Sequence, residues 1–257
     1  GTKRRLEWFR EFAAKVEEIK NSPLDLTNIE KVELTRTIDI WMLSQLNQHI
    51  KEATEALEGF QTRKALQESL FLLKKDVDHY LYRVKHLLDS QDPAIIYVLS
   101  TVLEAWIRLL APFTPHTCEE LWATYGGEGY VSQASWPEAD ESLVSPQIEK
   151  SEELVQNIKK MVKGDVEKIH VYLAPDWKWD LYEIAEEIGK PDIGQIMGRA
   201  IGANIYDDKK EIAAVAKKIG REMTKTKYVG KIDENQIISD AIDYIMEETG
   251  DKVIVHT

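Results

Sequence analysis

The stretch LLAPFTPHTCEELW (residues 109–122) places two prolines, a histidine and the single cysteine of the chain within a short distance. It predicts a corner between two helices. Pro112 ends the first helix, because a proline has no N–H to donate and its ring clashes with the preceding turn. Thr114 is expected to cap the second helix, with Pro115 as its first residue. The apolar stripe of this second helix would then consist of Cys118, Leu121, Trp122 and Tyr125.

A reactive or metal-binding centre at Cys118 is the competing interpretation of the same stretch. A zinc site needs about four ligands in spaced Cys or His pairs, whereas the chain has one cysteine and no second cluster. His116 and Cys118 are two residues apart, so on a helix their side chains point about 200° apart and cannot meet. The sequence therefore favours a structural corner and predicts no catalytic or metal-binding residue. A hydrolase using Cys118 and His116 is the least expected alternative.

The first 125 residues predict an antiparallel bundle of four or five helices. Apolar residues recur three and four apart over residues 3–20, 32–57, 61–89 and 92–110. Pro23 and Gly59 end the first and second of these helices, and the pair Asp92-Pro93 has the cap-then-proline pattern of a helix start. Long helices joined by short turns favour a bundle.

The composition changes at GGEGYVSQASWPEADESLVSP (residues 126–146), which is rich in Gly, Ser and Pro and has no hydrophobic periodicity. Beyond it, VEKIHVYLA (166–174) and KVIVH (252–256) alternate as strands do, with helices expected between them. The sequence thus predicts a mainly α protein. A helical bundle occupies residues 1–145, and a small α+β domain occupies residues 146–257.

The net charge of −12 argues against nucleic acid as a partner, but the charge is unevenly distributed. One segment, AKKIGREMTKTKYVGK (residues 216–231), is locally basic, with Glu222 as its one acid. Its basic residues are the predicted phosphate-binding cluster, for which a solvated helix face is the alternative: Lys217, Lys218, Arg221, Lys225, Lys227 and Lys231. Tyr228 is expected to stack on an exposed base or to pack in the core.

Weaker candidates lie elsewhere in the chain. The third helix of the bundle has a basic flank that could meet a nucleic-acid stem or be merely solvated: Arg63, Lys64, Lys74, Lys75, Arg83, Lys85 and His86. Trp179 and Tyr182 could form a stacking platform, although packing is the favoured role. Gly194, Gly198 and Gly202 recur every four residues. They favour close packing of a helix, with a phosphate contact through the neighbouring Arg199 as the alternative.

Three stretches of the sequence resemble one family. LLAPFTPHTCEELW, SWPEAD (135–140) and TIDIWMLSQLNQHIKEATEALEGFQTRKALQESLFLLKKDVDHYL (37–81) are similar to the helical anticodon-binding domain of class I aminoacyl-tRNA synthetases of the leucine, isoleucine and valine group. The pattern Asp-x-Trp-x-Leu-Ser-x-Leu of that domain is matched by Asp39, Trp41, Leu43, Ser44 and Leu46. IHVYLAPDWKWDLYEIA (169–185) resembles the start of the C-terminal domain of the archaeal-type leucyl-tRNA synthetases.

The resemblance implies the C-terminal part of such an enzyme, which docks the body and long variable arm of leucine tRNA. Catalytic and editing domains elsewhere in the parent chain would attach leucine with ATP and Mg²⁺. The signatures His-Ile-Gly-His and Lys-Met-Ser-Lys-Ser do not occur in the 257 residues, so the chain alone is expected to be inactive and to need no cofactor. A valyl-, isoleucyl- or methionyl-type synthetase that recognises the anticodon is one alternative. A free-standing tRNA-binding or assembly module is another.

The expected location is the cytoplasm, with no membrane contact and a monomeric state. We expect no apolar run that approaches the roughly 18 residues of a membrane span. The N-terminal GTKRRLEWFREF lacks the apolar centre of a signal peptide. A single cysteine is compatible with a reducing compartment.

Overall fold

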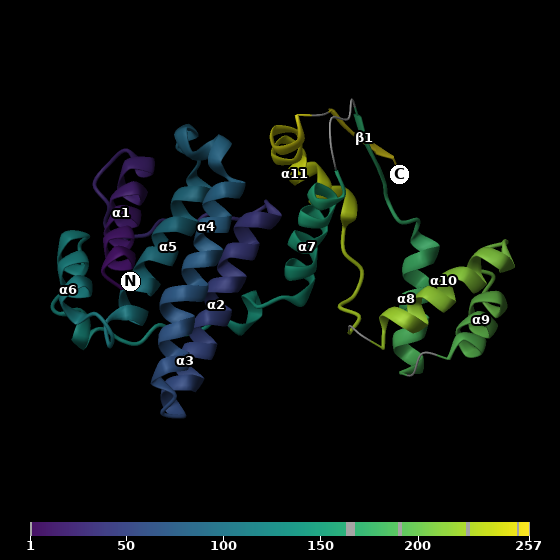
Figure 1. Cartoon of the computed structure of the whole chain (residues 1–257), viewed down its shortest axis with the longest axis horizontal. Coiled ribbons are helices and arrows are strands. Elements are labelled where there is room, and N and C mark those ends of the chain that lie inside the picture. The colour runs from purple at the N-terminus through teal and green to yellow at the C-terminus, as the bar shows by residue number, and fades with distance from the viewer. Residues whose placement is uncertain (1, 163–167, 190–191, 225–226, 251, 257) are drawn as a thin grey trace. The chain divides into compact units, whose positions relative to one another are not determined.

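The computed structural model describes residues 2–162, 168–189, 192–224, 227–250 and 252–256. It contains two compact units, Gly1–Ile148 and Glu149–Thr257, each of which is described by itself. The fold is mainly helical with one small sheet among the described residues (Figure 1), which confirms the predicted class.

The first unit is a helical bundle. Its helices are α1 (Thr2–Lys20), α2 (Thr37–Glu58), α3 (Thr62–Leu66), α4 (Leu73–Arg83), α5 (Pro93–Leu110) and α6 (Pro115–Thr124). A π-helical segment, η1 (Gln67–Leu72), joins α3 to α4, and short 3-10 turns follow at η2 (Lys85–Ser90), η3 (Val131–Gln133) and η4 (Glu141–Leu143). Helix α5 packs against α1, α2 and α6 and is therefore the centre of the unit.

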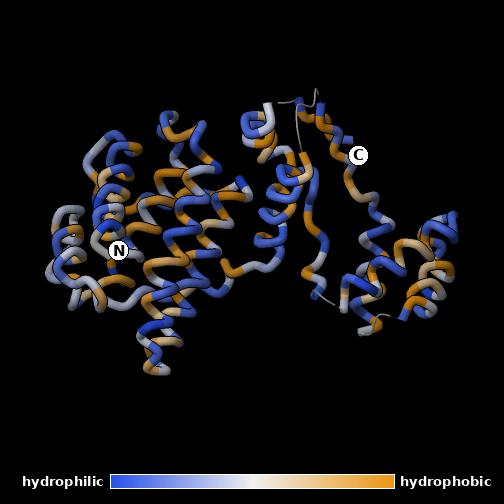
Figure 2. The backbone as a smooth tube through the Cα atoms, in the orientation of Figure 1, coloured by the Kyte–Doolittle hydropathy of each residue, from blue (hydrophilic) through white to orange (hydrophobic). Residues whose placement is uncertain are grey.

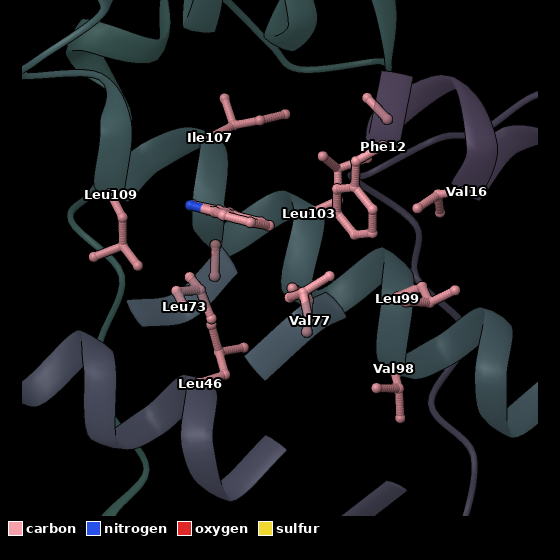
Figure 3. Close-up of a cluster of buried hydrophobic side chains, with 14 of the residues drawn as sticks. Phe12, Val16, Leu46, Leu73, Val77, Val98, Leu99, Leu103, Ile107 and Leu109 are labelled. Atoms are coloured by element: carbon pink, nitrogen blue, oxygen red, sulfur yellow. The ribbon is translucent and has the colours of Figure 1, made fainter. Parts of the chain in front are cut away.

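Helix α5 is long and apolar enough to cross a membrane by length and composition, contrary to the expectation from the sequence. However, 61% of its residues are buried within the structure, and the core helix of a globular bundle meets the same criteria. Figure 3 shows its side chains meeting those of α1, α2 and α4 in one cluster, which includes Phe12, Leu46, Val77, Leu99 and Leu103. Along the helices of the bundle, hydrophobic and hydrophilic residues alternate (Figure 2), as burial of one face requires.

The corner between α5 and α6 is confirmed. Thr114 is the N-cap of α6 and Pro115 its first residue. The Thr114 hydroxyl donates to the carbonyl of Leu110 at 3.3 Å and makes no capping bond to the first turn of α6. The predicted apolar stripe of Cys118, Leu121, Trp122 and Tyr125 is buried.

The expectation of one continuous α-helix over residues 61–89 is wrong. The wider turns of η1 interrupt it, and α4 ends at Arg83. A π-helical turn displaces carbonyls from the regular α-helical pattern, and these need other partners. The indole N–H of Trp106, on α5, donates to the carbonyl of Ser69 in η1 at 2.5 Å. The irregular segment is thus anchored to the core helix.

The second unit combines helices with a two-stranded sheet. Its elements are α7 (Pro146–Met161), which begins in the last residues of the first unit, β1 (Lys168–Tyr172), α8 (Asp176–Ile188), α9 (Ile193–Gly202), α10 (Lys209–Glu222), α11 (Glu234–Thr249) and β2 (Lys252–His256). The strands are parallel, with Ile169 opposite Val253. One apolar cluster joins the sheet to α7 and α11, and another holds α8, α9 and α10 together.

Candidate nucleic-acid interface

Helix α10 displays the first half of the predicted phosphate-binding cluster. Asp208 caps this helix by accepting from the N–H groups of Lys210 and Glu211. The apolar positions Ile212, Ala216 and Ile219 are buried, so the helix turns its remaining positions to solvent. Lys217, Lys218 and Arg221 are all exposed there.

The second half of the cluster follows α10. Lys227 and Lys231 are exposed, whereas Lys225 lies outside the described residues. Lys231 pairs with Asp176 at 2.7 Å, and on α10 Lys218 pairs with Glu222 at 3.6 Å. Such exposed pairs contribute little to stability and leave a lysine able to exchange its partner for a phosphate. Lys217, Arg221 and Lys227 make no ion pair with any described residue.

Tyr228 is half-buried and packs against the protein. Its ring stacks on that of Tyr182 with centroids 5.5 Å apart, and the Tyr182 hydroxyl donates to the Glu222 carboxylate. Burial, reinforced by nearby acidic side chains, raises the pKa of Tyr228. This geometry favours packing, the alternative that the sequence left open, over stacking on a base.

The tryptophans of α8 also pack against protein groups. Trp177 stacks on Tyr206 with centroids 4.3 Å apart and planes 3° apart. Trp179 lies 6.2 Å from Tyr182 at a tilt of 43°. Pro175 is the N-cap of α8 and Asp176 its first residue.

The glycines of α9 do not serve the close packing that their spacing predicts. A Cβ placed on Gly198 or Gly202 would meet no atom within 4 Å, so no backbone among the described residues approaches that face. Arg199 pairs with Glu187 at 3.0 Å on the surface.

The basic flank of the bundle is dispersed rather than continuous. Arg63, Lys64 and Lys75 are exposed, but Lys64 pairs with Glu52 at 2.7 Å. Lys74 bonds to Asp78 and lies 3.9 Å over the Trp8 ring. Lys85 lies 4.7 Å over the Tyr82 ring.

Arg83 is only 4% exposed, so its place on the predicted flank is wrong. Arg83 lies nine residues after Lys74 on α4, which places it about 180° around the helix, so it faces the core instead of the flank. His86 is exposed in η2, beyond the end of α4.

The polar residues of the Asp-x-Trp-x-Leu-Ser-x-Leu pattern stabilise the bundle. Asp39 is fully buried and accepts from the Tyr80 hydroxyl at 2.7 Å and from Nε of Arg36 at 2.6 Å. Burial raises the pKa of Asp39 despite these two bonds. Arg36 also pairs at 2.6 Å with Asp92, the N-cap of α5. One arginine thus ties the start of α2 to the start of α5.

The segment after α6 runs along α2. The Trp136 indole donates to the Thr54 hydroxyl at 2.8 Å, and the Asp140 N–H donates to the Asn47 side chain at 2.7 Å. Further along, the Ser145 N–H donates to the hydroxyl of Ser44 at 3.2 Å. Successive acceptors on α2 are three and seven residues apart, which places all three on one face of the helix. Ser44 and the SWPEAD segment therefore dock this stretch onto the bundle.

Cys118 is buried, whereas His116 is exposed. Burial raises the pKa of the Cys118 thiol to about 11, so the thiolate that a nucleophile needs is scarce at neutral pH. We expect the thiol of the native chain to react with an aromatic disulfide reagent at pH 8 at least about 100-fold more slowly than that of the unfolded chain. The absorbance of the released aromatic thiol, followed without urea and in urea that unfolds the chain, measures the two rates. Rapid reaction of the native thiol would contradict the structural interpretation.

Sequence reasoning missed a buried ionic cluster at His49. Its Nδ1 lies 2.9 Å from Glu68 and its Nε2 lies 2.9 Å from Asp76. Ionised carboxylates only accept, so both contacts are hydrogen bonds only when the ring carries two protons. Burial by itself lowers the pKa of His49, but the bonds to Asp76 and Glu68 outweigh it and raise the pKa.

The cluster predicts a pH dependence of stability. The folded-state pKa of His49 is raised, so its stabilisation is complete below the unfolded value of about 6.5 and is lost as pH rises through the folded pKa. Urea unfolding between about pH 6 and pH 9 should show this decline in the wild type and a flatter profile in His49→Gln. Equal declines in both proteins would assign the titration to another group.

Within the described ranges, no group of three or more His, Cys, Asp or Glu side chains is placed to hold a metal ion. The exposed basic residues of α10 and of the segment after it stay the candidate site, with phosphate as the predicted ligand.

Comparison with known proteins gives matches along the whole chain. Residues 39–169, about half of the chain, match the family described as the anticodon-binding domain of tRNA ligase. The leucine–tRNA ligase of Methanothermobacter thermautotrophicus is 47% identical over 264 residues, which cover 100% of this chain and 28% of that protein. The leucine–tRNA ligase of Pyrococcus furiosus is 37% identical over 236 residues, with 88% and 24% covered.

The chain thus spans about a quarter of the length of the curated relatives it matches. Among solved structures, the ternary LeuRS–tRNA–LeuAMS complex of Agrobacterium radiobacter is 27% identical, with a TM-score of 0.41, over 55% of this chain and 16% of that chain.

Proposed function

Because the chain belongs to the family of anticodon-binding domains of tRNA ligases, we propose that it is the tRNA-docking part of a leucine–tRNA ligase. The observation that carries the proposal is the 47% identity to the Methanothermobacter thermautotrophicus leucine–tRNA ligase along the entire chain. This similarity includes residues 170–257, which lie beyond the match to the anticodon-binding family. It therefore supports leucine tRNA over the tRNAs of other class I enzymes.

This chain and the other domains of a longer protein have separate tasks. Catalytic and editing domains outside these residues bind leucine, ATP and Mg²⁺ and attach leucine to tRNA. This chain holds the body and the long variable arm of leucine tRNA as a cytoplasmic monomer, without a cofactor of its own and without catalysis.

Contact with phosphate is the physical basis of this docking. Lys217 and Arg221 point to solvent from α10, with Lys227 exposed nearby in sequence. Each phosphate that such a side chain neutralises releases counterions, which supplies affinity that depends on salt. Contacts of this kind fix the position of the tRNA without recognising its sequence. They suit a part of the enzyme that orients the acceptor end toward a distant catalytic site.

A titration with two tRNAs tests the proposal. The full chain is titrated with leucine tRNA and with the same tRNA whose long variable arm is replaced by a short one. Tighter binding of the intact tRNA is expected, because the arm adds phosphates within reach of the second unit. Equal affinity would contradict recognition of the arm. Absence of binding to either tRNA would contradict the docking role.

A further inference from the structure

One face of the β1–β2 sheet carries basic and aromatic side chains. Successive residues of a strand point to opposite faces. The strands pair in register, with Tyr172 opposite His256. The residues of this face, which we call the open sheet face, are Lys168, His170 and Tyr172 from β1 and Lys252, Ile254 and His256 from β2.

The opposite face of the sheet is packed against helices. Ile169, Val171, Val253 and Val255 join the apolar cluster of α7 and α11. Parallel sheets occur almost only with both faces covered. Here the open sheet face stays accessible, and Tyr172 is 74% exposed. The open sheet face is therefore available to a partner.

Three rings on the open sheet face form a stack. The His170 and His256 rings lie 5.1 Å apart with planes within 13°, and the His256 and Tyr172 rings lie 4.6 Å apart with planes within 12°. Nδ1 of His170 lies 2.8 Å from Nε2 of His256, so one nitrogen donates and the other accepts. The stack ends at Tyr172, whose exposed ring packs with one face toward His256.

Charge identifies the kind of partner. Lys168 and Lys252 are opposite each other and exposed, and the described residues of the two strands include no acid. In a chain of net charge −12, this surface is locally positive. Lysines beside an exposed aromatic stack are the combination that binds unpaired nucleotides, with phosphates on the cations and bases on the rings.

We propose that the open sheet face binds unpaired nucleotides of RNA, with one base stacked on Tyr172 and the adjoining phosphates paired with Lys168 and Lys252. The inference rests on the proposed function, since tRNA is the RNA concerned, and adds a surface distinct in sequence from the cluster on α10. The signal was present in KIHVY, where basic and aromatic residues alternate with apolar ones. The apolar residues Ile169 and Val171 predict the strand, whereas the basic and aromatic residues lie on its other face.

Binding of leucine tRNA to variants of the full chain tests this inference. Tyr172→Ala should weaken binding roughly 5-fold or more, because stacking on one base contributes about 1–3 kcal/mol. Tyr172→Phe keeps the ring and should bind within about two-fold of the wild type. Tyr130 is 65% exposed in the first unit, so Tyr130→Ala is the matched control and should bind as the wild type does. Lys168→Ala/Lys252→Ala should flatten the salt dependence by about 1.4 units on single-stranded RNA.

Photo-crosslinking provides a second measurement. tRNA that contains 4-thiouridine in its unpaired loops should crosslink to the tryptic peptide IHVYLAPDWK (residues 169–178), and Tyr172→Ala should reduce the yield. Wild-type binding with no effect of Tyr172→Ala and no crosslink would overturn the inference while leaving the proposed function intact. Failure of the wild type to bind any tRNA would instead overturn the proposed function.

Discussion

Replacement of Trp106 by alanine is expected to lower the free energy of unfolding by about 3–5 kcal/mol. The side chain is completely buried at the centre of the first unit. Its ring lies 5.1 Å from that of Phe9 and 5.4 Å from that of Trp8. The substitution leaves a cavity that rigid helices fill only partly, and it removes the donor to the Ser69 carbonyl in η1. Urea unfolding followed by circular dichroism measures the effect.

Two further variants separate the causes. Trp106→Phe keeps a six-membered ring but cannot donate to Ser69 and leaves a smaller void, so it should lose at least about 1 kcal/mol and less than Trp106→Ala. Trp179→Ala removes a tryptophan that is only partly buried and should destabilise the chain less than Trp106→Ala. A similar loss for Trp106→Ala and Trp179→Ala would contradict a central role of Trp106 in the core.

Local signals in the sequence predict the regular elements of the fold well. Asp92-Pro93 marks the start of α5, and the side chain of Asp92 accepts from the N–H of Ala94 at 2.8 Å. Thr114-Pro115 marks the start of α6. In both cases the residues that fix the boundary are neighbours in sequence, so no knowledge of the tertiary structure is needed.

The interruption of the third helix could not be predicted in the same way. Nothing local in QESLFL (residues 67–72) distinguishes a π-helical turn from an α-helical one. Its stabilisation comes from Trp106, 37 residues beyond Ser69. The predicted basic flank failed for a different reason: Lys74 and Arg83 are nine residues apart on α4, which places them about 180° apart around the helix, and Lys85 lies beyond its end.

At the candidate site, the exposure of a side chain depends on residues nearby in sequence, whereas its partners are distant in sequence. The exposure of Lys217 and Arg221 follows from the apolar stripe of α10 itself. The stacking of Tyr228 on Tyr182 and the pairing of Lys231 with Asp176 join residues 46 and 55 positions apart. Composition alone marks these residues as basic or aromatic. It does not show which of them already have partners within the protein.

Removing two charges from α10 is expected to change the salt dependence of tRNA binding more than any other double substitution in the basic cluster. Lys217→Ala/Arg221→Ala deletes two exposed cations that make no ion pair with a described residue, so no acid is left unpaired. If each contacts one phosphate, the slope of log K against log salt becomes less steep by about 1.8 on duplex RNA, taking the value of about 0.9 per phosphate for duplex DNA. Fluorescence anisotropy at several salt concentrations measures the slope.

Lys15→Ala/Lys31→Ala is the matched control, because both lysines are exposed, lie outside the cluster and make no ion pair with a described residue. This variant has the same net charge as Lys217→Ala/Arg221→Ala. A general effect of net charge would therefore change both proteins equally. If α10 contacts phosphates, the slope of log K against log salt changes in the α10 variant and stays at the wild-type value in the control. Alanine favours helix more than lysine or arginine does, so weaker binding would not result from unfolding of α10.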